Sequence, residues 1–159
     1  MCGIAGSINF KEEPVSENLL KTMTETMVHR GPDDSGYFRD AHVALGFRRL
    51  SIIDLSGGKQ PMSNEDNTIW VVFNGEIYNF QELRNQLLAK GHVFKTKSDT
   101  EVIVHAYEEW GDRCMERFCG MFAYALYDQK QKKVIFARDR LGVKPLYYAW
   151  VDGQLLFGS

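Results

Sequence analysis

The second residue of this 159-residue chain is a cysteine, and its position gives it two reactive groups. Methionine aminopeptidases act when the second side chain is small, so removal of Met1 would leave Cys2 with a thiol and a free α-amine. An α-amine with a pKa of about 7.7–8.0 is a base near working pH, beside a thiol with a pKa of about 8.5. Cys2 is therefore a candidate nucleophile that needs no histidine partner. The alternative is an inert buried thiol at the start of a strand.

A second group of candidate residues follows the apolar segment 70–73, where Asn74 and Gly75 precede Glu76. An asparagine amide and a glycine N–H at the end of a strand can both donate to one developing oxyanion. The same Asn-Gly pair is also the strongest short signal for a hairpin turn. The pattern alone leaves both interpretations open.

Two further charged residues could hold the charged ends of an amino acid. Arg49 lies at the end of an apolar segment, where a guanidinium can clamp a carboxylate with two parallel hydrogen bonds. Asp99 begins a predicted helix and could hold an ammonium group. The alternatives are a structural ion pair for Arg49 and a favourable interaction with the helix dipole for Asp99.

The remaining cysteines and histidines match no known pattern for metal binding. Cys114 and Cys119 have no partner pair at metal spacing, so buried thiols are favoured over a zinc site. None of the four histidines lies in a His-Glu-x-x-His pattern, and no phosphate-binding glycine loop is present. The sequence therefore predicts neither a metal site nor a nucleotide site.

The composition indicates an ordinary globular domain. Hydrophobic residues make up 44% and charged residues 25% of the chain. The net charge of −2 gives no reason to expect nucleic acid or a membrane surface as a partner, and no apolar run approaches the roughly 20 residues of a spanning helix. Three cysteines, an odd number, argue against a secreted disulfide scaffold and for a reducing compartment.

Hydrophobic periodicity predicts the elements that position these residues. Strands are expected at 2–10, 36–39, 43–50, 69–74, 121–128, 133–137, 146–151 and 155–158. Helices are expected at 16–28, from an Asn79/Glu82 capping pair to Gly91, from a Ser98/Glu101 capping box to Gly111, and at 112–118. The polar segment 54–67 is a long loop, and 122–127 should be covered on both faces.

This element order predicts the α+β class, with stacked, largely antiparallel sheets and the helices outside. The chain stops at Ser159 on an expected strand, which is typical of a fragment of a longer protein.

Several motifs in fixed order resemble the class II glutamine amidotransferases. They are Cys2-Gly-Ile-Ala-Gly6, His29-Arg-Gly-Pro-Asp33, Arg49-Leu-Ser-Ile52, Asn74-Gly-Glu-Ile-Tyr-Asn79, Ser98-Asp-Thr-Glu101, Gly120-Met-Phe-Ala123 and Arg138-Asp-Arg-Leu-Gly-Val-Lys-Pro-Leu-Tyr-Tyr148. Together they span essentially the whole chain. Within the class, the second and fourth motifs are most similar to the glutaminase domain of glutamine-hydrolysing asparagine synthetases. Glutaminase domains that feed amino-sugar or purine synthesis usually vary there.

The resemblance implies a fold and a role for each matching residue. The fold would be the four-layer αββα sandwich of the N-terminal nucleophile hydrolases, forming one glutaminase domain over residues 1–159. Cys2 would attack the amide carbon of L-glutamine, with its own α-amine moving the proton. The remaining roles would be an oxyanion hole at Asn74 and the Gly75 N–H, a carboxylate site at Arg49, an ammonium site at Glu76 and Asp99, and a pocket wall at the backbone of Leu50, Ser51, Ile52 and Ile53.

The resemblance also implies a C-terminal synthetase domain that this chain lacks. That domain would use ATP and Mg²⁺ to activate aspartate and would receive ammonia through an internal tunnel. The glutaminase domain itself is expected to need no cofactor and to work in the cytoplasm, and the full-length protein could form a homodimer.

Three other functions remain as alternatives. The first is a catalytically silent structural or interaction domain of the same fold, and the second is the glutaminase domain of another amidotransferase. The third is an amidase or peptidase with an N-terminal nucleophile that acts on another acyl group. The combination of Arg49 and Asp99 favours a free amino acid as substrate over that third function.

Overall fold

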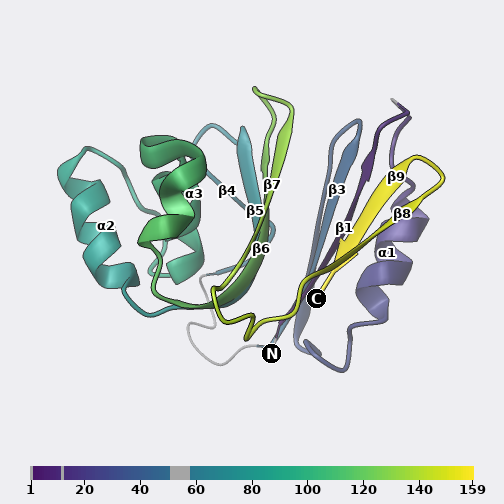
Figure 1. Ribbon diagram of the computed structural model, residues 1–159, viewed down its shortest axis with the longest axis horizontal. Coiled ribbons are helices and arrows are strands. Elements are labelled where there is room, and N and C mark those ends of the chain that lie inside the picture. Colours follow the sequence, from purple (N-terminus) through teal and green to yellow (C-terminus); the bar gives the residue numbers. More distant parts are fainter. Residues whose placement is uncertain (1, 12, 51–57) are drawn as a thin grey trace.

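A computed structural model describes residues 2–11, 13–50 and 58–159. Among these residues, two antiparallel β-sheets pack face to face, and helices lie on the outer face of each sheet (Figure 1). The layers follow one another as helices, sheet, sheet and helix. The predicted α+β class and four-layer αββα sandwich are therefore confirmed.

The first sheet carries the N-terminus on a central strand. Its order is β2 (Asp34–Arg39), β3 (Val43–Arg49), β1 (Gly3–Asn9), β9 (Gln154–Gly158) and β8 (Tyr147–Val151). β1 pairs antiparallel with β3 on one side and with β9 on the other. Cys2 directly precedes this strand, which hydrogen bonds hold along both of its edges.

The second sheet has the order β4 (Met62–Ser63), β5 (Ile69–Ile77), β6 (Gly120–Asp128) and β7 (Lys133–Arg138). β5 is longer than predicted and includes Asn74 and Gly75, which pair with Ala123 and Phe122 of β6. The hairpin-turn interpretation of Asn-Gly is therefore wrong. A Cβ at Gly75 would collide with the backbone of β6, so a close approach of two strands explains this glycine.

The helices are α1 (Glu17–Glu25), α2 (Phe80–Ala89) and α3 (Asp99–Trp110), and α3 leads into the 3-10 helix η1 (Gly111–Arg117). The Ser98 side chain caps α3 by accepting from Thr100 N. Gly91 and Gly111 have positive φ angles of 98° and 61°, as expected of residues that end helices.

The predicted capping role of Asn79 before α2 is wrong. Its side chain makes no cap bond; instead it donates to the carbonyl of Arg117 and accepts from Cys119 N. Asn79 therefore ties the start of α2 to the chain that enters β6. No helix of the described ranges has the length and apolar character needed to cross a membrane.

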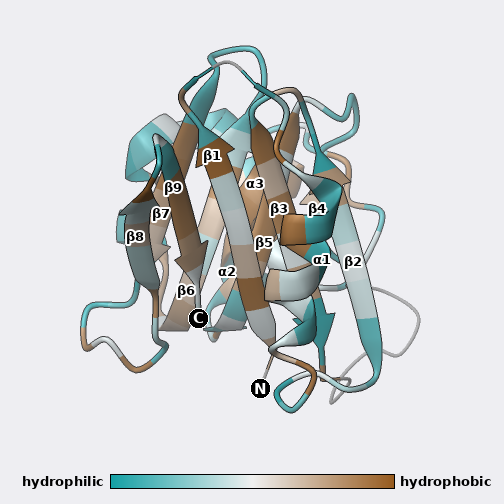
Figure 2. Cartoon of the chain, turned by 90° about the vertical axis from the view of Figure 1, so that its right-hand side faces the viewer, coloured by the Kyte–Doolittle hydropathy of each residue, from teal (hydrophilic) through white to brown (hydrophobic). Residues whose placement is uncertain are grey.

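Alternating residues of β6 fill two separate cores. Phe122, Tyr124 and Leu126 pack towards α2 and α3, whereas Ala123, Ala125 and Tyr127 pack between the sheets. The prediction that both faces of 122–127 are covered is confirmed. Figure 2 shows α1 lying over the β2–β3 side of the first sheet, and the residues of β8 at its other edge are exposed.

Glu101 anchors the segment that leads into α3. Its carboxylate accepts from Lys95 N at 2.6 Å and from Thr96 N at 2.7 Å. Burial alone would raise the pKa of Glu101, but the bonds from His105, Thr96 and Lys95 lower it to about 2. The predicted capping box is therefore half present, since Ser98 caps the helix while Glu101 binds N–H groups further upstream.

Glu101→Gln is expected to reduce the acid sensitivity of the fold. The ionised carboxylate stabilises the folded state above its unfolded pKa of 4.5, and this contribution is lost as the pH falls towards 2. Urea unfolding at pH 7 and pH 3 should show a larger fall in the free energy of unfolding for wild type than for Glu101→Gln. Equal falls would contradict this role, and Glu116→Gln, at an exposed carboxylate, is the control.

Candidate active site

A cavity of about 330 Å³ opens beside Cys2, between the start of β1 and the end of β5. The predicted site residues among its lining are Cys2, Arg49, Leu50, Asn74, Gly75, Glu76 and Asp99. Ser51, Ile52 and Ile53 lie outside the described residues, as does Met1. The fold therefore brings to one cavity every predicted site residue that the structure describes.

Cys2 lies half-buried at the wall of this cavity, with its thiol free. Its Sγ donates to the carbonyl of Leu50 at 3.9 Å, a long contact that a substrate could replace. Leu50 directly follows β3, the neighbour of β1 in the sheet. The thiol therefore lies at the end of the first sheet where β1 begins, and it can be reached from the cavity.

Asn74 connects the two sheets at this point. In the orientation that its neighbours require, its amide nitrogen donates to the carbonyl of Cys2 at 3.0 Å and its amide oxygen accepts from Arg30 Nη2 at 3.1 Å. Arg30 also donates through Nη1 to Ser159 Oγ at 3.2 Å. The amide is therefore clamped at both ends with its nitrogen directed towards the nucleophile residue.

Charges of both signs lie around the same cavity. Arg49 is buried, with 7% of its surface exposed, and Asp99 faces the cavity from the first turn of α3. Burial raises the pKa of Asp99, and the neighbouring charge of Glu76 adds to this, against hydrogen bonds from Ile77 and Thr100 N–H. A bound cation would favour the ionised form of Asp99.

Gln60 was not singled out from the sequence, yet it holds the cavity wall together. Its side chain accepts from Phe73 N at 2.6 Å and donates to Thr100 Oγ1 at 3.3 Å. These bonds connect β5 to the start of α3, where Asp99 lies. Gln60 lies in a polar loop without a recognisable motif, so no sequence signal could have found it.

Arg30 and Lys144 belong to two of the sequence motifs, but the motifs alone predict no role for either residue. Lys144 is buried, with 6% of its surface exposed, and it lines the cavity. The Asp139 carboxylate positions it by accepting from the backbone N–H groups of Val143 and Lys144 at 2.9 and 3.0 Å. The motif around residues 138–148 therefore contributes a cation at the cavity on a tightly hydrogen-bonded loop.

A family model described as a glutamine amidotransferase domain matches residues 1–159. The chain belongs to the glutamine amidotransferase family. This membership confirms the predicted class of enzyme and the resemblance on which it rested.

Individual relatives narrow the comparison within the glutamine amidotransferases. Asparagine synthetase [glutamine-hydrolyzing] 1 of Bacillus subtilis is 47% identical over all of this chain, which covers 26% of that protein. An asparagine synthetase [glutamine-hydrolyzing] of Zea mays is 42% identical, with 100% of this chain and 27% of that protein covered. The chain thus spans about a quarter of the curated relatives that it matches.

A solved structure shares the fold of this amidotransferase domain. It is the glutamine phosphoribosylpyrophosphate amidotransferase from B. subtilis, in complex with ADP and GMP. The TM-score is 0.81 over 99% of this chain and 41% of that chain, at 19% sequence identity. At this identity the likeness supports the arrangement of the four layers alone.

Proposed function

We propose that the chain hydrolyses the side-chain amide of L-glutamine with processed Cys2 as the nucleophile. One observation carries the proposal: the Cys2 thiol shares a single small cavity with a buried cation, Arg49, and a half-buried carboxylate, Asp99. These two charges complement the α-carboxylate and α-ammonium of a free amino acid. A reactive thiol beside them suits an amide at the end of the substrate side chain.

The first half of the proposed reaction releases ammonia. The Cys2 α-amine accepts the thiol proton while sulfur attacks the amide carbon of glutamine. The resulting oxyanion would accept hydrogen bonds from the Asn74 amide and the Gly75 N–H. The α-amine then passes its proton to the leaving nitrogen, so that the C–N bond breaks, NH₃ departs and a γ-glutamyl thioester remains.

The second half consumes one water molecule. The α-amine removes a proton from water as the water oxygen attacks the thioester carbon. The same donors, Asn74 and Gly75, would stabilise the second oxyanion. The C–S bond then breaks, the thiolate regains its proton and glutamate leaves. The protein needs no cofactor for these steps, because every proton that moves is held by the substrate, water or Cys2.

The positions of the charged residues support the proposed substrate contacts. Arg49 would hold the α-carboxylate through two parallel hydrogen bonds, and Asp99 with Glu76 would hold the α-ammonium. The backbone of residues 50–53 would complete the pocket wall, as the motif resemblance suggests.

We further propose that ammonia from this reaction supplies asparagine synthesis in a longer parent protein. The support is the match of this chain to about a quarter of proteins named glutamine-hydrolysing asparagine synthetases. Aspartate, ATP and Mg²⁺ would then be used by a separate synthetase domain. The free thiols of Cys2, Cys114 and Cys119 suit a reducing cytoplasm, and a homodimer of the full-length protein stays a prediction.

The test compares glutamate and ammonia release from L-glutamine, D-glutamine and N-acetyl-L-glutamine, after mass spectrometry has confirmed loss of Met1. We expect equal amounts of both products from L-glutamine and almost none from the other two, because the analogues misplace or lack the α-ammonium. Absence of hydrolysis with all three would favour a silent domain. Efficient hydrolysis of the acetylated compound would favour an amidase for another acyl group.

Arg49→Ala is expected to raise KM for L-glutamine by about 100-fold, because the substrate carboxylate would lose a bidentate, charge-assisted partner. kcat should fall less, since the carboxylate is remote from the reacting amide. Steady-state kinetics of glutamate release measure both constants, with Arg39→Ala, at an exposed residue of β2, as the control. An unchanged KM would show that the carboxylate binds elsewhere.

A further inference from the structure

We propose that His92, His105 and Glu108 form a binding site for a divalent transition metal ion, with Zn²⁺ as the best fit. The three side chains converge beside α3, and a ligand atom of each lies within 4.8 Å of the others. His105 and Glu108 belong to α3, and His92 lies in the segment between α2 and α3. None of the three lines the cavity at Cys2, so the site is separate from the proposed glutaminase reaction.

The separations of the three ligand atoms match the edges of a tetrahedron. His92 Nδ1 lies 3.3 Å from His105 Nδ1, and Glu108 Oε2 lies 3.1 Å from His105 Nδ1 and 3.7 Å from His92 Nδ1. Tetrahedral zinc with bonds of about 2.0–2.1 Å requires ligand separations of about 3.3–3.4 Å. A zinc ion therefore fits among these atoms with side-chain shifts of a few tenths of an ångström.

Outer carboxylates lie where they would fix the tautomer of each histidine. Glu109 Oε2 is 3.4 Å from His92 Nε2, and Glu101 Oε1 is 3.7 Å from His105 Nε2. Zinc-binding histidines commonly donate their other ring N–H to such a carboxylate. With Nε2–H of both rings donated to Glu109 and Glu101, Nδ1 of each ring would be the atom left to bind the metal ion.

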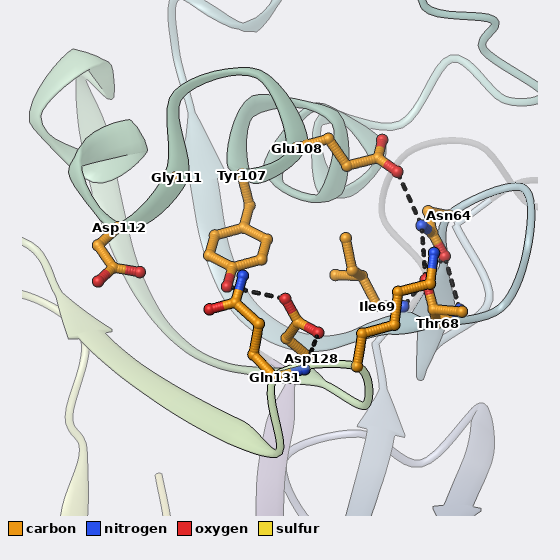
Figure 3. A pocket seen from close by; sticks show the side chains of 10 residues that line it. Asn64, Thr68, Ile69, Tyr107, Glu108, Gly111, Asp112, Asp128 and Gln131 are labelled. Carbon is orange, nitrogen blue, oxygen red and sulfur yellow. Dashed lines mark hydrogen bonds between the residues drawn. The ribbon is translucent and has the colours of Figure 1, made fainter.

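Glu108 is itself oriented towards the histidines. Its Oε1 accepts from Asn64 Nδ2 at 2.7 Å, on the side of a neighbouring cavity of about 320 Å³ (Figure 3). Its Oε2 is the atom that approaches His92 and His105. Three protein ligands leave the fourth tetrahedral position to water, or to Glu65 after a side-chain movement, since Glu65 Oε1 lies 3.8 Å from His105 Nδ1.

Without a metal ion, the same atoms share protons. Burial would lower the pKa of His105, but Glu101 and Glu108 outweigh this and raise it to about 9. A zinc ion that binds Nδ1 would displace a proton from His105, which is the usual exchange when a metal ion enters a histidine site.

The site would join separate segments of the layers formed by the second sheet and its helices. His92 follows α2, His105 and Glu108 belong to α3, and Glu65 and Asn64 lie at the β4–β5 connection. A metal ion there would fasten α3, whose first residue is Asp99, to its neighbours. Because the ion would link these separate segments away from the cavity at Cys2, the expected role is structural.

The test is a zinc titration of chelator-treated Cys2→Ala, Cys119→Ala protein. Both thiols are removed because an N-terminal cysteine binds zinc through its amine and sulfur, and Cys119 is exposed. We expect one equivalent of Zn²⁺ to bind and to raise Tm. Co²⁺ in its place should give the intense visible bands of tetrahedral coordination, and Mg²⁺ should not compete.

Ligand and control variants in the same background locate the site. His92→Gln and Glu108→Gln should weaken zinc binding by more than about 100-fold, and Glu109→Gln by about 10–100-fold, as for other outer-shell partners. His29→Gln, at an exposed histidine outside the cluster, should bind zinc as the background does. Urea unfolding without metal checks that each variant is folded.

Histidine NMR signals provide a readout that needs no further variant. Zinc should shift the ring signals of His92 and His105 and leave those of His29 and His42 in place. Binding that persists at full strength in His92→Gln, or that leaves the His92 and His105 signals unchanged, would overturn the proposal. No binding at one equivalent would overturn it as well.

Discussion

Replacement of Cys2 by alanine is expected to lower kcat/KM for glutamate release from L-glutamine by at least about 10³-fold. The sulfur is the proposed attacking atom, and no other cysteine lines the described part of the cavity to replace it. The fold should be intact, because among the described residues Sγ makes one long hydrogen bond, to the carbonyl of Leu50, and alanine keeps the Cβ that packs at the edge of the core. Activity measured together with urea unfolding would separate lost chemistry from lost stability.

The matched control for this variant is Cys119→Ala. Cys119 is also a free thiol, but it is exposed and lies outside the lining of the cavity. The Cys119→Ala variant should retain the kcat and KM of wild type. Comparable glutamate release from Cys2→Ala and wild type would show that the thiol of Cys2 is not the nucleophile.

The α-amine half of the assignment has its own test. A lysine inserted between Met1 and Cys2 prevents removal of Met1, because aminopeptidases require a small second residue. The thiol is then present but its α-amine is locked in a peptide bond, so the proposed base is lost. We expect this protein to be as inactive as Cys2→Ala. Full activity with Met1 in place would remove the α-amine from the mechanism.

The element types could be predicted because local patterns and tertiary packing agree. The run 122–127 is apolar at successive positions, and the structure places a core on each side of it. Ser98 was predicted as a helix cap and forms that bond. At such places the nearest neighbours in sequence decide the structure.

The errors occur where residues distant in the sequence override a local signal. Asn74-Gly75 reads locally as a turn, yet β6 offers a pairing partner for every residue of 69–77 and extends the strand through it. The local pattern predicts a helix cap at Asn79, but its amide instead donates to the carbonyl of Arg117 and accepts from the N–H of Cys119. The two residues that bind the Asn79 amide are 38 and 40 residues away in the sequence, so no local pattern could include them.

The site shows the same division. The polar residues around Cys2 could be predicted from motifs, but which atoms meet depends on how the two sheets pack. The bond of Arg30 to Asn74 joins the segment after α1 to β5 of the other sheet. The cluster of His92, His105 and Glu108 likewise depends on how α3 packs against the segment before it.

Asn74→Ala is expected to lower kcat by about 10²–10³-fold with little change in KM. The amide nitrogen would donate to the oxyanion, which exists only in the transition state, and removing such a donor typically costs about 2.7–4 kcal/mol. Steady-state kinetics of glutamate release measure the effect. Asn79→Ala, which removes an asparagine that ties α2 to η1, should lower stability and leave kcat unchanged. A rise in KM with kcat unchanged would instead place Asn74 in substrate binding.

A double-mutant cycle can show how Asn74 is positioned. Arg30 donates to the Asn74 amide oxygen, and the Cys2 carbonyl accepts from its nitrogen, so both ends of the amide are fixed before substrate arrives. Arg30→Ala should therefore lower kcat by freeing the amide to rotate, by less than loss of the amide itself. Once Asn74 is alanine, removal of Arg30 should add almost nothing, because its effect acts through that amide. Fully additive losses would mean that Arg30 acts on the substrate or on Cys2 directly, and the oxyanion donor would then be held by the Cys2 carbonyl alone.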